Sequence, residues 1–459
     1  MDAETAYLFR HALLRDAAYQ LQLPGERARL HALALASIEQ TLAPLGQAAL
    51  DAAAEDLAHH ARQAALGRGQ DDMAAKEAEY LWRAARHLER AFHIDRAVQL
   101  YERLAGHAHA TELRKAEALQ AAGAALATAG RLTLAEPWLV RARQAAEQCG
   151  AKNLAARSLC SLGLLLTQLG RSSEAEVALV AARPMVEASG DQELSWMLQH
   201  NEAILFHHLG RNSDAEAGSR RACAVATAVG ESRWLAAALV TSGVICKHTG
   251  RLEEAERYYR QALDLCRQGR LPIQELSTRY NLFGLLVDSA RYDEATAEFS
   301  AIMNLCAETG ARRMEGLAIG NFAILRARLG FLDESYRLLM RSVSLAREAG
   351  NRVGEAASLG NLGCNSNTEG RFSDAERLLS EALEIHRQVQ NRRFLGAHGA
   401  PRAVALLGLG RRAEAERQWR EALSIIRSLP DPLLLQAQIQ DMHEICRKYG
   451  LEPLPAEGE

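Results

Sequence analysis

The sequence predicts an all-α protein whose helical hairpins stack into a right-handed superhelical solenoid. The main observation is a small turn residue that recurs every 40 residues, at Gly130, Gly170, Gly210, Gly250, Ala290, Gly330, Gly370 and Gly410. A repeat of fixed period that continues over about 300 residues is the signature of a solenoid. Composition supports helix throughout, because the 459 residues include only 10 prolines and 5 % aromatic residues.

A second series of glycines lies half a period away from the first, at Gly150, Gly190, Gly230, Gly310 and Gly350, with Gly269 one residue early. Glycine ends helices because it readily adopts the left-handed backbone conformation. Each unit is therefore expected to be a helix, a turn, a second helix and another turn.

Arginine follows most glycines of the first series, close to the negative end of the preceding helix dipole. A serine or threonine then precedes a glutamate by three residues, as in Ser173 with Glu176 and Ser373 with Glu376. We expect these pairs to be capping boxes that start the second helix of each unit.

Small and large residues alternate at fixed places within each unit. A small residue stands at Gly123, Gly163, Ala203, Gly243, Ala323 and Gly363, with Phe283 as the exception. An alanine follows every first-series turn, as at Ala255, except that Ser335 takes its place after Gly330. A large apolar residue comes four positions after that alanine, as at Tyr259 and Leu379. We expect the small residues to mark close helix approaches that the large residues fill.

This pattern of small residue, glycine turn, alanine and large apolar residue resembles the tetratricopeptide repeat, in its longer 40-residue variety. The resemblance covers about eight units in residues 111–429. It implies a solenoid that binds proteins or peptides on its concave face.

The segments outside the array are predicted to be helical as well. Residues 1–43 form a hairpin, 44–110 degenerate repeats, and 430–459 a capping helix and tail. The string from Phe9 to Gln20, with Arg29-Leu30-His31, resembles the end of the winged-helix region in bacterial STAND-type signalling ATPases. That resemblance implies the C-terminal arm of such a protein; a simple cap for the solenoid is the alternative.

Several function classes lack their sequence signals. The chain contains no G-x-x-x-x-G-K-[ST] phosphate loop, no H-E-x-x-H and no G-x-S-x-G, so we expect no enzyme activity, cofactor or metal. A net charge of −3 does not produce the positive electrostatic field that attracts nucleic acid, so we expect no nucleic-acid partner. No apolar run reaches membrane length and no signal peptide opens the chain, so we expect a cytoplasmic protein. The eight cysteines form no C-x-x-C pair and are expected to be buried and reduced.

Asparagine recurs at one place on the first helix of the units, at Asn201, Asn281, Asn321 and Asn361, with Ser161 and Thr241 in the gaps. Asparagine is a poor residue inside helices, so its recurrence needs a reason. It either makes a hydrogen bond between helices, or it offers a donor and an acceptor to the backbone of an extended peptide. The resemblance to kinesin-light-chain-like and LGN-like tetratricopeptide proteins implies the second role.

Other polar residues share the face expected to be concave and would set specificity. They are His200, His207, His208, Lys247, His248, Tyr280, Asp288, Arg328 and Asn367. The stretch from 200 to 250 leans basic and would suit an acidic or C-terminal carboxylate partner. An ordinary solvated helix face is the alternative for the whole set.

The sequence therefore predicts a non-catalytic scaffold that binds a protein or an extended peptide, as the sensor or docking arm of a bacterial signalling system. One alternative is a small-molecule effector site with walls from Trp196, Trp234 and Tyr280 that controls a STAND-type ATPase or a transcriptional regulator. A third reading is a truncated enzyme whose ATPase is encoded upstream.

Overall fold

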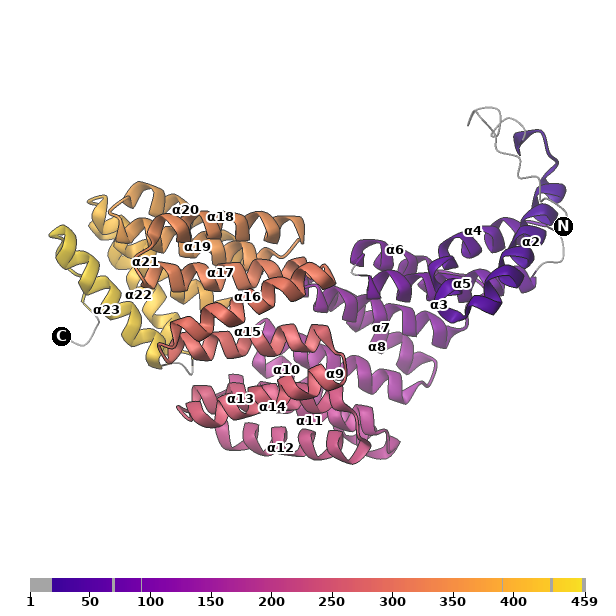
Figure 1. Ribbon diagram of the computed structural model, residues 1–459, viewed down its shortest axis with the longest axis horizontal. Coiled ribbons are helices and arrows are strands. Elements are labelled where there is room, and N and C mark those ends of the chain that lie inside the picture. Colours follow the sequence, from indigo (N-terminus) through magenta and orange to yellow (C-terminus); the bar gives the residue numbers. More distant parts are fainter. Residues whose placement is uncertain (1–18, 68–70, 92, 390, 430–431, 456–459) are drawn as a thin grey trace. The chain divides into compact units, whose positions relative to one another are not determined.

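The computed structural model describes residues 19–67, 71–91, 93–389, 391–429 and 432–455, and the α-helices found there are α2 to α23 (Figure 1). Most of the string that resembles the STAND winged-helix region lies outside the described residues. The chain divides into two compact units. Unit 1 comprises the residues up to 125 with 144–151, and unit 2 comprises 126–143 with 152–459.

Unit 1 contains the helices that precede the regular array. They are α2 (Pro24–Leu42), the 3₁₀-helix η1 (Ala43–Leu45), α3 (Gln47–Ala52), α4 (Ala54–Ala65), α5 (Asp71–Arg90), α6 (Ile94–Ala105) and most of α7 (Glu112–Thr128). Leu57, Leu81, Tyr101 and Leu104 are almost fully buried between them. The buried hydroxyl of Tyr101 donates a hydrogen bond to Glu89 (2.7 Å).

Unit 2 contains the regular hairpins. Their helices are α8 (Leu132–Gln148), α9 (Lys152–Gln168), α10 (Ser172–Ser189), α11 (Gln192–His208), α12 (Asn212–Val229), α13 (Ser232–His248), α14 (Leu252–Gln268), α15 (Pro272–Asp288), α16 (Tyr292–Thr309), α17 (Arg312–Arg328), α18 (Leu332–Glu348), α19 (Arg352–Thr368), α20 (Phe372–Gln388), α21 (Arg392–Gly408), α22 (Arg412–Arg427) and α23 (Pro432–Tyr449). The last residues of α8 belong to unit 1. The expected all-α class and hairpin solenoid are confirmed.

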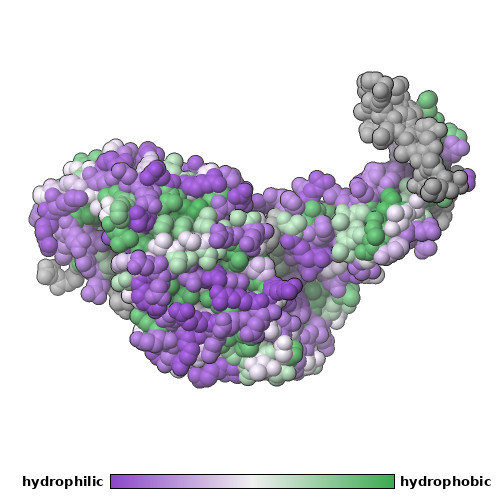
Figure 2. All heavy atoms as spheres, in the orientation of Figure 1, coloured by the Kyte–Doolittle hydropathy of each residue, from purple (hydrophilic) through white to green (hydrophobic). Residues whose placement is uncertain are grey.

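The hairpins of unit 2 form two layers. The odd-numbered helices α9 to α21 each pack against the next odd-numbered helix as well as against their own partner, and we call them the inner layer. The even-numbered helices α10 to α22 pack mainly against the inner layer. Because the inner helices approach one another more closely, their free face is the concave one. In Figure 2, hydrophilic side chains cover most of the visible face, with smaller apolar patches among them.

The close approach of the two helices in each hairpin is confirmed. A Cβ atom placed on Gly163 would lie 2.5 Å from Leu179, and one on Gly243 would lie 2.5 Å from Tyr259. Gly363 meets Leu379 at the same distance. The small residue therefore makes room for the large residue of its partner helix.

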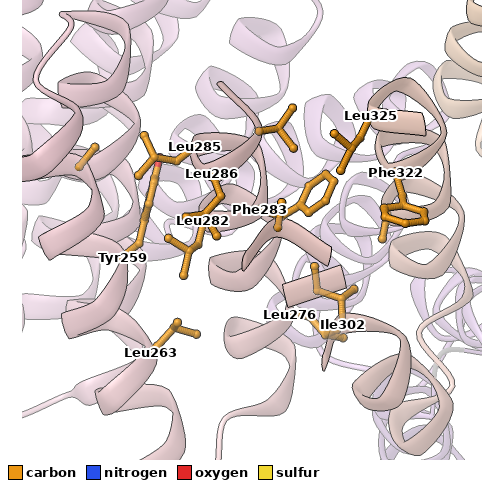
Figure 3. Close-up of a cluster of buried hydrophobic side chains, with 14 of the residues drawn as sticks. Tyr259, Leu263, Leu276, Leu282, Phe283, Leu285, Leu286, Ile302, Phe322 and Leu325 are labelled. Atoms are coloured by element: carbon orange, nitrogen blue, oxygen red, sulfur yellow. The ribbon is translucent and has the colours of Figure 1, made fainter. Parts of the chain in front are cut away.

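The hairpin that lacks the small residue is packed differently. Phe283 itself fills the core, together with Leu282, Leu286 and Ile302 (Figure 3). Phe299, the large residue of this hairpin, instead stacks on Phe322 of α17, with ring centroids 4.0 Å apart. Phe299 packs against the next hairpin because Phe283 occupies the space that the large residue fills in the other hairpins.

The expected capping boxes are wrong. The second helices begin directly after the arginine, so Arg171 is the N-cap of α10 and makes no side-chain cap bond. The glutamate reaches the next hairpin instead, where Arg171 meets Glu136 (2.7 Å) and Arg211 meets Glu176 (3.1 Å). Ion pairs between hairpins thus replace the predicted caps, because Ser173 already lies inside its helix.

The turns confirm the left-handed conformation, including two places without glycine. The turn glycines of the array have φ between 62° and 85°, except Gly269, whose φ is −81°. Ala290 adopts φ 57° and Arg270 adopts φ 50° in the equivalent places. The fold imposes this conformation even on residues whose Cβ disfavours it.

The C-terminal helix α23 packs against the last hairpins of the array. The Nζ of Lys448 and the hydroxyl of Tyr449 both donate to the carbonyl of Thr368, at 2.7 and 2.8 Å. Beyond α23, the indole of Trp419 donates to the carbonyl of Pro455 (2.9 Å). No described helix combines the length and the apolar composition that a membrane span requires.

Candidate functional site

The asparagine row lies on the inner layer, and its four members differ in environment. Asn201 is only 4 % exposed, and its Nδ2 donates to the backbone carbonyl of Cys160 on α9 (2.9 Å). That bond joins two inner helices, so Asn201 serves packing.

The later asparagines are partly exposed. Asn281 donates to the carbonyl of Ser277, one turn back in α15 (2.8 Å). Asn321 hydrogen-bonds with Tyr280 of the preceding inner helix. Asn321 and Asn361 also line one small cavity of about 40 Å³, with Arg313, Ser358 and other residues of α17, α18 and α19. The row therefore divides by exposure: Asn201 is buried, whereas Asn281, Asn321 and Asn361 are partly exposed, and Asn321 also contacts the preceding inner helix.

His200 takes part in an aromatic stack. Its ring lies parallel to that of Trp196, with centroids 4.9 Å apart, and Trp196 stacks on Trp234 at 5.5 Å. Burial lowers the pKa of His200 to about 4. The two tryptophans expected to wall a small-molecule pocket thus contact each other, while Tyr280 contacts Asn321.

His207, His208 and His248 form a second cluster. The rings of His207 and His248 lie 4.8 Å apart. Burial, followed by the influence of His248, His208 and Arg393, lowers the pKa of His207 to about 4. His200 and His207 are therefore neutral at pH 7, and the expected basic character of residues 200–250 does not come from these two imidazoles.

The remaining predicted residues lie at different depths. Lys247 and Asp288 form an ion pair with each other (2.7 Å). Arg328 is exposed at the end of α17. Asn367 is completely buried, and its Nδ2 donates to the carbonyl of Pro401 (2.8 Å), so its placement in the groove is wrong. The prediction failed because position 367 lies on the side of α19 that faces α21, and not on the free face of the inner layer.

The structure adds cations that the sequence reasoning missed. Arg313 and Arg393 occupy equivalent places in the first turns of α17 and α21. Burial lowers the pKa of Arg313, although a guanidinium keeps its charge at neutral pH. Its Nη1 donates to the carbonyl of Thr128 (3.3 Å), and its Nε is buried without a partner in the described residues. The sequence could have indicated these two cations, because arginine recurs at 80-residue intervals, at positions 233, 313 and 393.

The arrangement suits recognition through hydrogen bonds and charge. Side-chain amides at Asn321 and Asn361 can both donate and accept, and Arg313 can pair with a carboxylate. Among the described residues, no group of three histidine, cysteine or acidic side chains could hold a metal ion.

Comparison with known proteins identifies the repeats. Residues 196–268 and 314–388 match the family model of the tetratricopeptide repeat. A search of curated protein sequences gave no match. The chain therefore contains tetratricopeptide repeats in the middle and later parts of unit 2.

Two solved structures share the fold at low identity. The first is a Rap protein complexed with competence and sporulation factor, at a TM-score of 0.53 and 14 % identity, over 82 % of this chain and 92 % of that one. The second is the Rap conjugation gene regulator of plasmid pLS20 in complex with the Phr* peptide, at 0.52 and 14 %, over 75 % and 96 %. Such likeness shows a shared helical-repeat solenoid.

Proposed function

We propose that the inner layer of unit 2 binds an extended segment of a protein or peptide partner, without catalysis. The observation that carries this proposal is the position of Asn321 and Asn361. Both are partly exposed on the inner layer, one hairpin apart, and both line the same small cavity beside Arg313. Equal spacing along the solenoid matches the regular donors and acceptors of an extended backbone.

The charge beside this cavity narrows the partner's chemistry. Arg313 brings a cation to the surface that the two asparagines share, and its Nε lacks a hydrogen-bond partner. A carboxylate, either an acidic side chain or a chain terminus, would satisfy both the charge and the donor. We therefore propose a partner segment with an acidic group at this point.

The structural neighbours support peptide binding by this fold. Both have partner molecules in their structures, competence and sporulation factor in one and the Phr* peptide in the other. By analogy, this chain would act as a cytoplasmic sensor or docking arm in a bacterial signalling system. The sequence string near residues 9–20 further suggests a STAND-type ATPase or a transcriptional regulator as the controlled protein.

A peptide-display selection against the full chain tests the proposal. Selected peptides are measured by fluorescence anisotropy on the wild type and on Asn321→Ala/Asn361→Ala. Each lost hydrogen bond costs about 0.5–1.5 kcal/mol, so the double variant should bind about five- to a hundred-fold more weakly. Selected peptides should also be enriched in acidic residues.

A matched control separates binding from folding. Asn304 is an exposed asparagine on the outer helix α16, so Asn304→Ala should leave both affinity and melting temperature unchanged. The double variant should lose only about 0.5–1.5 kcal/mol of stability, from the bond between Asn321 and Tyr280, and so show at most a small fall in melting temperature. Unchanged affinity of the double variant would refute the proposed site, and a large loss of melting temperature would show that these amides serve packing as Asn201 does.

A further inference from the structure

Unit 1 contains a cavity that is separate from the inner layer of unit 2. It is a pocket open to solvent, with a volume of about 540 Å³, among α4, the first half of α5 and the end of α6. Arg62 and Leu66 come from α4, Glu77 from α5, and Arg103 and His107 from the end of α6 and the segment after it. This volume falls in the range of small-molecule sites, about 300–1,000 Å³.

One side of the cavity holds a buried carboxylate whose charge is already balanced. Glu77 is 8 % exposed and accepts a hydrogen bond from Arg103 (3.2 Å). Its other oxygen lies 3.3 Å from Nε2 of His107. Nδ1 of His107 is buried and lacks a partner in the described residues, so this wall has an unmet hydrogen bond. Since Arg103 neutralises Glu77, this group of residues does not repel an anion.

The lining also includes a cation without a partner. Within the described part of the chain, no hydrogen bond or ion pair engages the side chain of Arg62, which is exposed at the cavity's edge. Ala65, Leu66 and Ala74 provide apolar surface next to it. The cavity thus combines one available guanidinium with an apolar wall.

We propose that this cavity binds a small organic carboxylate that carries an apolar group. The carboxylate pairs with Arg62, because a guanidinium donates two parallel hydrogen bonds to it. The apolar group covers the alanine and leucine side chains. The proposal does not depend on peptide binding by unit 2, because every residue named here belongs to unit 1.

The test uses two probes of similar size and opposite charge, benzoate and benzylamine, with the full-length chain. Binding is measured by saturation-transfer NMR and by isothermal titration. Benzoate should bind at least about threefold more tightly than benzylamine, because the unpaired charge in the cavity is positive. Absence of benzoate binding, or equal binding of both probes, would overturn the proposal.

Two arginine variants locate the binding. Arg62→Gln removes the charge and should weaken benzoate at least about threefold, without weakening benzylamine, whose repulsion by the guanidinium is removed. Arg29→Gln is the control, because Arg29 is an exposed arginine of α2 that does not line the cavity. Equal benzoate affinity in Arg62→Gln and the wild type would place the binding elsewhere and refute the site. Circular dichroism melts confirm that both variants are folded.

Discussion

The buried histidine pair of α20 and α21 predicts that acid loosens the end of the array. Nε2 of His386 lies 3.1 Å from Nδ1 of His398, and the side chains are 0 % and 3 % exposed. Phe394 stacks on His386, with centroids 5.1 Å apart. Gly360 leaves space for the His398 ring, which a Cβ at that position would meet at 2.1 Å. A proton gained by either imidazole would place a positive charge in an apolar site, which is unfavourable.

The direction and size of the effect follow from the pKa values. Burial lowers the pKa of His386 to about 4, and burial, aided by His386, lowers that of His398 to about 3. An unfolded histidine has a pKa of about 6.5. Both histidines therefore contribute full stability above about pH 6.5, and the contribution falls as the unfolded state gains protons below that pH. At pH 5 the loss is roughly 2 kcal/mol for each histidine, or about 4 kcal/mol for the pair.

The assay compares pH 7.5 with pH 5.0 in the wild type and in His386→Asn/His398→Asn. Asparagine can hydrogen-bond but does not titrate in this range. Because a repeat array need not unfold in one step, hydrogen exchange of peptides from α20 and α21 reports the local free energy of opening. Wild-type protection should fall by about 4 kcal/mol between the two pH values, and the double variant should lose most of this dependence.

The control is His443→Asn, which replaces an exposed histidine of α23 and should keep the wild-type response. The reasoning is refuted if the double variant loses as much local stability at pH 5.0 as the wild type. That outcome would show that groups other than His386 and His398 cause the loss of local stability in acid.

Four further predictions concern stability and reactivity. Asn201→Ala should cost about 1–3 kcal/mol in urea unfolding, because the buried carbonyl of Cys160 loses its donor; no measurable loss would contradict its packing role. Ala290→Gly should raise the melting temperature slightly. Relief of the left-handed strain at Ala290 should outweigh the extra backbone entropy that glycine gives the unfolded chain, by up to about 1 kcal/mol. A lower melting temperature would show that the strain is absent. Ala255→Leu should overpack a fully buried site and cost about 1–3 kcal/mol, seen as a lower denaturation midpoint. Maleimide at pH 8 should label the exposed Cys149 quickly and Cys160 hardly at all, because burial raises the pKa of the Cys160 thiol to about 12; mass spectrometry of the modified peptides checks this.

The cysteines show that a local sequence pattern does not by itself predict burial. All eight were expected to be buried, yet Cys149 is exposed and only Cys160, Cys246, Cys266, Cys306 and Cys446 are buried. Cys149 lies at the end of α8, just before Gly150, where the helix ends at the surface. Apolar character predicts burial only where another element covers the residue.

The repeat architecture was determined by the sequence alone. Glycine, alanine and the large apolar residue recur at positions where chain geometry allows little choice: a left-handed turn, a close helix approach and the space opposite it. Gly243 with Tyr259 is such a pair, and its contact follows from residue size and spacing within one hairpin. These are local constraints, so the sequence contains all the information needed to predict them.

The tertiary structure decided which side chains of each repeat are available to a partner. Asn201 and Asn361 occupy equivalent places in their repeats, but Asn201 is buried against α9 while Asn361 lines a cavity. The glutamates expected to cap their own helices pair with arginines of the next hairpin, as Glu176 does with Arg211. Burial, pairing and the protonation of His200 and His207 depend on which neighbouring helices cover a position. That covering differs from repeat to repeat, because the side chains of adjacent hairpins differ even where the 40-residue pattern is the same.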